Sequence, residues 1–332
     1  MSNITTAHAR VRQVEPDDAA TAAFRGDIWE GLSQDPKRIP PKYFYDEHGL
    51  ELFEAITRTP EYYLTRAELA ILNDNAAAIA SQIPPGAAMI EFGSGPTTKA
   101  RILLQAAQIA AYVPVDICGP VLASEASRME SDFPGLKVVP VAADFTKPFD
   151  LPGAVAGMPV VGFFPGSTLG NFEAHEATAF LRHVARMLGP DARLIVGVDL
   201  VKEPELIHHA YNDASGITAA FNLNLLNRIN RELDANFDID GFRHCALYNR
   251  ERHRVEMHLV SRVRQKVRVG GRGFDFRRGE TIHTENSYKY TLEMVRTIAE
   301  GAGWRKAAVW LDPDQYFSVH VLICQEDAFI SD

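Results

Sequence analysis

Five short apolar runs, separated by segments with helical spacing, occupy the middle of this 332-residue chain. Runs that are apolar at nearly every residue are typical of strands buried on both faces, and helices between them supply the crossovers that parallel strands need. The pattern therefore predicts an α/β fold with a parallel sheet covered by helices. The predicted strands are 87–92, 111–115, 136–141, 160–164 and 193–198, and the predicted helices include 98–110 and 174–188.

The last part of the chain predicts a different strand arrangement. A helix over 290–302 precedes two strand-like runs, 306–311 and 317–324, which are joined only by residues 312–316. So short a connection forces an antiparallel pair, because a parallel crossover needs a dozen or more residues. Five parallel strands completed by an antiparallel hairpin resemble the Rossmann-like sheet of class I methyltransferases, whereas NAD-binding Rossmann domains more often stay parallel.

Two segments outside this sheet predict a second domain that is discontinuous in sequence. Residues 10–66 show helical and turn-like patterns, and residues 201–290 combine a long helix, predicted over 207–233, with alternating runs typical of strands. We expect these segments to form an α+β substrate-binding domain over the carboxyl edge of the sheet. The sheet domain, which would bind the cofactor, is assigned to residues 67–200 and 291–332.

Composition excludes several classes of function. The chain carries 34 Lys and Arg against 43 Asp and Glu, a net charge of −9, which argues against general binding to nucleic-acid phosphates. The three cysteines form no CxxC motif and the histidines form no HExxH motif, so we expect no metal. The sequence shows no signal peptide and no apolar run of membrane length. We therefore expect a cytoplasmic monomer that binds neither membranes nor nucleic acids, with the basic stretch 262–268 as a solvated strand face.

Ligand-binding groups follow three successive predicted strands. The glycine turn 93–95 follows the first strand, Asp116 ends the second, and Asp144 and Phe145 follow the third. Glycines let the backbone approach a ligand closely, and a carboxylate at a strand end can accept hydrogen bonds from ribose hydroxyls. Thr98 replaces the third glycine of a dinucleotide motif, which weakens the case for a pyrophosphate. We expect a nucleoside-type cofactor, S-adenosylmethionine.

Five further segments together resemble one enzyme family, the histidine Nα-methyltransferases of ergothioneine biosynthesis. They are 43–46, 52–68, 166–171, 210–222 and 283–290, and they read YFYD, LFEAITRTPEYYLTRAE, GSTLGN, AYNDASGITAAFN and HTENSYKY. The resemblance implies transfer of methyl groups from S-adenosylmethionine to the α-amino group of L-histidine. Three rounds would give Nα,Nα,Nα-trimethylhistidine, hercynine, as the first step of ergothioneine biosynthesis.

The resemblance also implies one candidate catalytic residue and a set of cofactor contacts. Tyr45 matches a tyrosine close to the amine that is methylated, and we expect it to orient this amine rather than to deprotonate it. An ordinary amine with a pKa of about 8 is partly neutral at pH 7, so a strong base is not required. The implied cofactor-binding residues are Gly93, Lys99, Asp116, Asp144, Phe145 and Gly166.

The implied substrate contacts include a pair of residues suited to an imidazole ring. Glu285 and Ser287 are two residues apart, so on a strand their side chains face the same way. A carboxylate and a hydroxyl can bind the two ring nitrogens, and a pocket for tryptophan or an aliphatic side chain would not need them. Asn171 and Tyr211 match residues that hold the α-carboxylate. The full set of implied substrate-binding residues is Tyr62, Asn171, Tyr211, Met257, Glu285, Asn286 and Ser287.

Two other functions stay open at this stage. One is a methyltransferase of the same fold that acts on another amino acid or a small amine. The other is a non-catalytic relative that keeps the fold for ligand binding. The polar groups retained on both the cofactor side and the substrate side argue against loss of catalysis.

Overall fold

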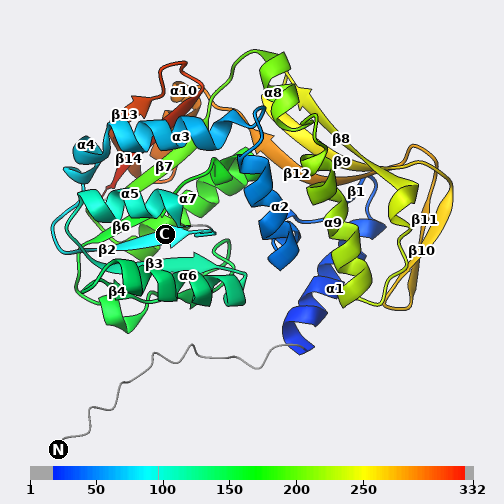
Figure 1. The fold of residues 1–332 in the computed structure, drawn as a ribbon, viewed down its shortest axis with the longest axis horizontal. Helices are drawn as coiled ribbons and strands as arrows, with labels where there is room; N and C mark the ends of the chain where they lie inside the picture. Colours follow the sequence, from blue (N-terminus) through cyan, green and yellow to red (C-terminus); the bar gives the residue numbers. More distant parts are fainter. Residues whose placement is uncertain (1–17, 96, 326–332) are drawn as a thin grey trace, which may run out of the picture.

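The computed structural model describes residues 18–95 and 97–325. Residues 10–17 and 326–332, which the two predicted domains include, lie outside the described residues, as does Pro96. The described chain contains a large sheet of eight strands, a smaller sheet of four strands and a two-stranded hairpin. Figure 1 shows the large sheet in the left half of the molecule and the smaller sheet in the right half.

The large sheet has the strand order β13-β14-β7-β6-β2-β3-β4, and β5 also pairs with β3. The strands from β7 to β4 are parallel, whereas β14 is antiparallel to β7 and β13 is antiparallel to β14. The predicted α/β sheet with a C-terminal antiparallel hairpin is therefore confirmed. The strands are β2 (Ala87–Phe92), β3 (Ile109–Asp116), β4 (Lys137–Val138), β5 (Val141–Ala142), β6 (Val160–Phe164), β7 (Arg193–Asp199), β13 (Trp304–Leu311) and β14 (Phe317–Cys324).

Helices cover both faces of the large sheet. Met89 packs in one apolar cluster with residues of α3, α4, α5 and α6, whereas its neighbour Ile90 packs in a second cluster with residues of α7 and α10. Adjacent strand residues point to opposite faces, so each cluster marks one side of the sheet. These helices are α3 (Tyr63–Asp74), α4 (Ala76–Ala80), α5 (Thr98–Ala106), α6 (Gly119–Asp132), α7 (Ala174–Leu188) and α10 (Leu292–Gly301).

The smaller sheet has the order β1-β12-β9-β8 and brings the N-terminal segment next to residues 242–288. β1 runs parallel to β12, which is antiparallel to β9, and α2 packs against α9 beside them. The elements are α1 (Asp18–Ser33), β1 (Lys37–Arg38), α2 (Glu47–Thr57), α8 (Pro204–Ala210), α9 (Ile217–Glu232), β8 (Phe242–Asn249), β9 (Arg254–Ser261) and β12 (Thr281–Tyr288). Four 3-10 helices complete the described structure: η1 (Pro41–Phe44), η2 (Gly153–Val155), η3 (Thr168–Asn171) and η4 (Ile239–Gly241).

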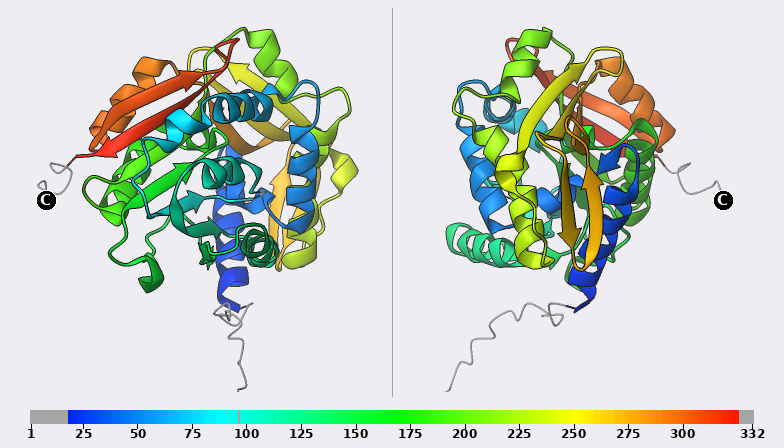
Figure 2. Two further views of the ribbon diagram at one scale, coloured as in Figure 1. Left: turned by 60° about the vertical axis from the view of Figure 1, so that its left-hand side comes forward. Right: turned by 90° about the vertical axis from the view of Figure 1, so that its right-hand side faces the viewer.

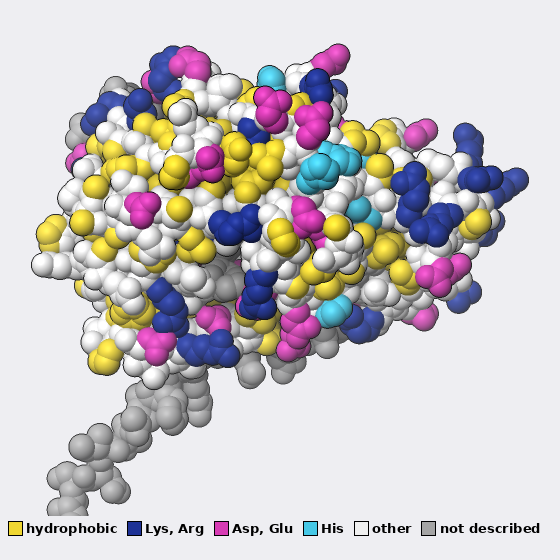
Figure 3. Space-filling model, turned by 45° about the horizontal axis from the view of Figure 1, so that its top comes forward, with side chains coloured by type: hydrophobic (Ala, Val, Ile, Leu, Met, Phe, Trp, Pro, Cys, Tyr) yellow, Lys and Arg dark blue, Asp and Glu magenta, His cyan; other side chains and the backbone are white. Residues whose placement is uncertain are grey.

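The hairpin of β10 (Gln265–Val269) and β11 (Arg272–Phe276) lies against α1, as the right-hand view of Figure 2 shows. The indole N–H of Trp29 donates to the carbonyl oxygen of Val269 at 2.9 Å. Along β10 the basic side chains are exposed and the valines are buried, which confirms the predicted solvated face for residues 265–268. The predicted alternation is wrong for residues 262–264, which precede the strand and are all exposed, Val263 included. Figure 3 shows Lys and Arg side chains gathered at this end of the molecule.

Three predicted elements were wrong in their extent. The strand predicted over 136–141 is split into β4 and β5 around Pro140, whose nitrogen has no hydrogen to donate to a neighbouring strand. The helix predicted over 98–110 ends at Ala106, and β3 begins at Ile109. The helix predicted over 207–233 is two helices, α8 and α9. No helix among the described residues is long and apolar enough to cross a membrane.

The break between α8 and α9 has a clear physical cause. Gly216 has a φ of +71°, a backbone conformation that glycine adopts without strain. The carboxylate of Asp213 accepts the backbone N–H groups of Ile217 and Thr218 at 2.9 and 2.8 Å. These groups begin a new helix and have no partner within it, so Asp213 supplies one. The residues between the helices therefore start α9 rather than continue α8.

Candidate functional site

A cavity of about 1060 Å³ lies at the carboxyl edge of the large sheet, where residues of the smaller sheet and of α2 face it. Thirteen of the fourteen predicted site residues line this cavity, so the fold brings both predicted binding sets together. Those residues are Tyr45, Tyr62, Gly93, Lys99, Asp116, Asp144, Phe145, Gly166, Asn171, Tyr211, Met257, Glu285 and Ser287.

The cofactor end of the cavity begins at the glycine turn after β2. Gly93 and Gly95 have φ angles of +73° and +41°, and a Cβ atom on Gly93 would lie 3.2 Å from the ring of Phe145. The carboxylate of Asp116 accepts the backbone N–H of Gly95 at 3.1 Å and that of Cys118 at 2.9 Å. The turn and the carboxylate thus fix each other at the ends of adjacent parallel strands.

Asp144 and Phe145 form the neighbouring wall of this end. The backbone N–H of Thr146 donates to Asp144 at 3.1 Å, and the Nζ of Lys42 lies 3.6 Å from the other carboxylate oxygen. The Phe145 ring packs edge-on against Phe164, with ring centroids 5.7 Å apart. A carboxylate beside an aromatic wall fits a heterocycle with an amino group. Together with the glycine turn and Asp116, these residues fit a nucleoside cofactor.

Glu68 ties two further cofactor residues together, and no sequence pattern had singled it out. It is 1% exposed, and its carboxylate accepts the backbone N–H of Gly166 and pairs with the Nζ of Lys99 at 2.6 Å. A Cβ on Gly197 would lie only 2.0 Å from the same carboxylate, so this strand position has room only for glycine. The available signal was the position of Glu68 at the end of the motif 52–68.

Glu285 and Asn171 meet at the substrate end. The side-chain N–H of Asn171 donates to Glu285 at 3.3 Å, and Met257 lies opposite Glu285 on the paired strand β9. Burial raises the pKa of Glu285 to about 7, although Lys289 and Asn171 act in the opposite direction. The carboxyl group is therefore poised to gain or lose a proton near neutral pH.

Ser287 and Tyr211 form a hydroxyl pair on the same wall. Their oxygens lie 2.7 Å apart, and the ring of Tyr62 meets the Tyr211 ring edge-on at 6.2 Å. Tyr62 is buried and Tyr45 is partly buried, and burial raises the pKa of each phenol well above its ordinary value. These tyrosines therefore present neutral hydroxyl groups rather than phenolates, which suits Tyr45 to orienting an amine.

Asn286 is the predicted site residue that the structure does not bring to the cavity. It lies between Glu285 and Ser287 on β12, so its side chain points to the opposite face of the sheet. There its amide N–H donates to Glu173 at 3.1 Å, and its oxygen lies 2.9 Å from the Nε2 of His283.

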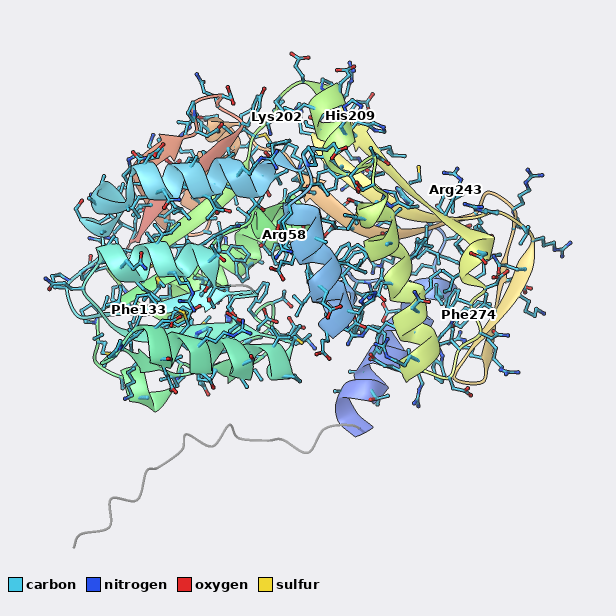
Figure 4. The ribbon with its side chains drawn as sticks, in the orientation of Figure 1. Arg58, Phe133, Lys202, His209, Arg243 and Phe274 are labelled. Atoms are coloured by element: carbon cyan, nitrogen blue, oxygen red, sulfur yellow. The ribbon has the colours of Figure 1, made fainter. Side chains whose placement is uncertain are left out.

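A buried ionic network lies behind the hydroxyl pair, and the sequence analysis did not predict it. Lys289 is fully buried and pairs with Asp199 at 2.9 Å, and Lys202 pairs with the same carboxylate. The phenol of Tyr63 also donates to Asp199, at 2.8 Å. In Figure 4, Lys202 marks the place where the chain leaves β7 for α8. Lys289 follows Ser287 by two residues, which was the available signal that the two side chains share a face.

The described residues contain no group of three or more His, Cys, Asp or Glu side chains arranged to hold a metal ion. The sheet order, the glycine turn and the carboxylates at successive strand ends instead define the class of S-adenosylmethionine-dependent methyltransferases. Residues 24–324 match the model of a family described as histidine-specific methyltransferase, SAM-dependent. The chain belongs to this family, which confirms the resemblance seen in the sequence.

The names of similar proteins agree with this assignment. The chain is 40% identical to the histidine N-alpha-methyltransferase of Mycolicibacterium smegmatis, over 92% of this chain and 96% of that protein. Its identity to the histidine N-alpha-methyltransferase of Mycobacterium tuberculosis is 39%, over 89% of this chain and 93% of that protein. It is also 30% identical to ergothioneine biosynthesis protein 1 of Neurospora crassa, over 86% of this chain but only 33% of that longer protein.

Proposed function

We propose that the chain methylates the α-amino group of L-histidine, with S-adenosylmethionine as methyl donor. Three transfers give Nα,Nα,Nα-trimethylhistidine, hercynine, the first step of ergothioneine biosynthesis. The observation that carries this proposal is the pairing of Glu285 and Ser287 on one face of β12 at the cavity wall, in a member of a histidine-specific family. The names of the mycobacterial and fungal relatives support it.

The cofactor end has residues for each part of the methyl donor. S-adenosylmethionine supplies an electrophilic methyl group on a sulfonium centre. Asp116 would accept hydrogen bonds from the ribose hydroxyls, while Asp144 and Phe145 would hold the adenine amino group and ring. Lys99, fixed by Glu68, would place its positive charge near the carboxylate of the methionine portion.

The substrate end has residues for each group of histidine. The amide of Asn171 and the hydroxyl of Tyr211 would donate to the α-carboxylate, while Glu285 and Ser287 would bind the two imidazole nitrogens. Tyr45 would orient the amine, whose lone pair must be free of a proton to react. Holding the reacting atoms in line converts an encounter of two molecules into a single-site step, and no covalent enzyme intermediate is needed.

Calorimetry followed by mass spectrometry tests this proposal. L-histidine, L-tryptophan and Nα,Nα-dimethylhistidine are titrated into protein saturated with S-adenosylhomocysteine. The protein is then incubated with S-adenosylmethionine and L-histidine, and the mass of the product is measured. We expect selective binding of the two histidines and a product heavier than histidine by three methyl groups. Protein that binds S-adenosylhomocysteine but not histidine would overturn the substrate assignment. Protein that binds neither ligand would overturn the methyltransferase function.

A further inference from the structure

The buried ammonium group of Lys289 has three acceptors and uses all three of its hydrogens. Its Nζ lies 2.8 Å from the Tyr211 hydroxyl, 2.9 Å from the Ser287 hydroxyl and 2.9 Å from a carboxylate oxygen of Asp199. A lysine ammonium has three N–H donors and no acceptor, so each contact directs a hydrogen away from Lys289. The residue is fully buried and is not part of the cavity wall.

We propose that Lys289 is a positioning residue that holds the Ser287 and Tyr211 oxygens as acceptors. Both hydroxyl hydrogens can then turn to the substrate when it binds, and the site takes histidine with a neutral imidazole ring in preference to imidazolium. The inference rests on the proposed function, because it concerns how the same site recognises histidine.

The number of hydrogens on the two hydroxyl groups limits what they can donate to a ligand. The Ser287 and Tyr211 oxygens are 2.7 Å apart, so in this structure one hydroxyl donates to the other and only one hydrogen is left for a ligand. Because Lys289 donates to both oxygens, its ammonium group offsets the repulsion between them when histidine binds and this hydrogen bond breaks. Tyr211 can then donate to the α-carboxylate while Ser287 donates to a ring nitrogen.

A donating Ser287 requires a ring nitrogen that carries no hydrogen. The other ring nitrogen then carries the N–H, which the carboxylate of Glu285 accepts. An imidazolium ring would present a second N–H to an oxygen that already accepts from an ammonium, which would bring two positive charges to one oxygen. Such like-charge contacts are unfavourable where little water screens them.

The surrounding charges keep Lys289 paired. Asp199 lies between Lys289 and Lys202, and burial lowers the pKa of Lys202 to about 8. A buried charge is stable only when it is paired, and the carboxylate provides this partner for Lys289. The titratable groups that face or pair with this network come from α3 and the residue before it, β7, β8, β12, the residues after β7 and α8, and the turn after β13; they are Tyr62, Tyr63, Asp199, Lys202, Tyr211, Tyr248, Glu285 and Asp312.

A matched pair of variants tests the proposal. Lys289→Met and Lys202→Met each remove one lysine from Asp199 and leave the other, but only Lys289 contacts the two hydroxyls. Histidine binding is measured by calorimetry with S-adenosylhomocysteine present, at about pH 6 and about pH 8, on either side of the ring pKa. The affinity for S-adenosylhomocysteine, together with thermal unfolding, reports whether each variant keeps its fold.

We expect wild type and Lys202→Met to bind histidine several-fold more weakly at the lower pH. Lys289→Met is expected to bind histidine about 10- to 100-fold more weakly than wild type at the higher pH. Its further loss at the lower pH should be smaller than that of wild type, and the titration of Glu285 accounts for the part that remains. A purely structural role for Lys289 would weaken binding equally at both pH values. Lys289→Met with the wild-type affinity or the wild-type pH ratio would overturn the proposal.

A second measurement needs no variant. Histidine labelled with ¹⁵N in its ring is bound to the wild-type protein with S-adenosylhomocysteine at about pH 6, and nuclear magnetic resonance distinguishes protonated from unprotonated nitrogens. We expect one protonated and one unprotonated ring nitrogen in bound histidine. Two protonated nitrogens would overturn the role of Lys289 but leave the proposed function intact, whereas no histidine binding at any pH would overturn the proposed function itself.

Discussion

Both carboxylate oxygens of Glu68 accept the backbone N–H of Gly166, at 3.0 and 2.9 Å, although the two residues are 98 positions apart in the sequence. The same carboxylate pairs with Lys99 on α5. One side chain from α3 therefore fixes both the loop after β6 and the helix after the glycine turn. These are the two segments that would hold the methionine portion of the cofactor.

Glu68→Gln should weaken the binding of S-adenosylhomocysteine by about tenfold, because Lys99 loses its charged partner in a buried setting. Calorimetric titration measures the change. Glu293→Gln is the control and should leave the affinity unchanged. Glu293 on α10 forms an exposed ion pair with Arg296, and exposed ion pairs contribute little to stability. An intact Glu68→Gln protein with unchanged affinity would show that Lys99 does not depend on Glu68.

Gly197→Ala should lower the free energy of unfolding by about 2–3 kcal/mol, since the new Cβ would lie 2.0 Å from Glu68 and 3.0 Å from the Phe317 ring. Gly26→Ala is the control, because no atom lies within 4 Å of its Cβ and alanine favours a helix. The free energy of unfolding of Gly26→Ala should rise by up to about 1 kcal/mol. Urea unfolding measures both, and equal stability of the two variants would contradict the packing described at Gly197.

Glu285→Ala should reduce kcat/KM for histidine by about two to three orders of magnitude, because a buried ring N–H would lose its acceptor. Asn286→Ala is the neighbouring control. Its side chain contacts Glu173 and His283 on the other face, so we expect a change of less than about threefold. Steady-state kinetics measure both values. A large loss in Asn286→Ala would instead support the sequence-based prediction that Asn286 contacts the substrate.

The stability of the protein should fall as the pH rises from about 6 to about 9. Burial raises the pKa of Glu91 to about 8, from an ordinary 4.5, so the folded state holds a proton that the unfolded state releases. The stabilisation is fully present below about pH 4.5 and is lost as the pH rises through about 8, and it amounts to a few kcal/mol.

Urea unfolding of wild type and Glu91→Gln at several pH values checks this prediction. The glutamine cannot ionise and still offers an oxygen to the Tyr112 hydroxyl, so its free energy of unfolding should depend less on pH. Glu285 titrates in the same range and leaves part of the slope in both proteins. Parallel curves for the two proteins would exclude Glu91 as a source of the pH dependence.

Much of the fold could be predicted because the sequence marks the ends of its elements. The strands 87–92, 160–164 and 317–324 and the helix 174–188 have the predicted bounds, since glycine, proline and polar residues flank their apolar residues. The helix predicted over 207–233 fails because apolar residues recur with helical spacing on both sides of the break, whereas the side-chain cap from Asp213 depends on the folded loop.

Some residues of the candidate site could be predicted from local sequence patterns, and others could not. The glycine turn and Asp116 follow local patterns, because they stand at strand ends that a parallel sheet brings to one edge. The pairings of Glu68 with Gly166 and of Lys289 with Asp199 join distant segments, and no local pattern predicts them. The division into two domains stays a prediction, because one apolar cluster runs from Met89 in the large sheet to Phe24 in α1.

The parallel pairing of β1 with β12 imposes an order on biosynthesis. The segment of α1 and β1 leaves the ribosome well before its partner strand, which ends at Tyr288, so β1 and β12 cannot pair until about 250 further residues have been made. At about 5–20 residues per second this delay is roughly 10–50 s. Phe24 can pack on Tyr43, which is made soon after it, but α1 stays without its contacts to β11 until residues 272–276 have been made. The helix α1 is thus exposed to chaperones and proteases until late in the synthesis of the chain.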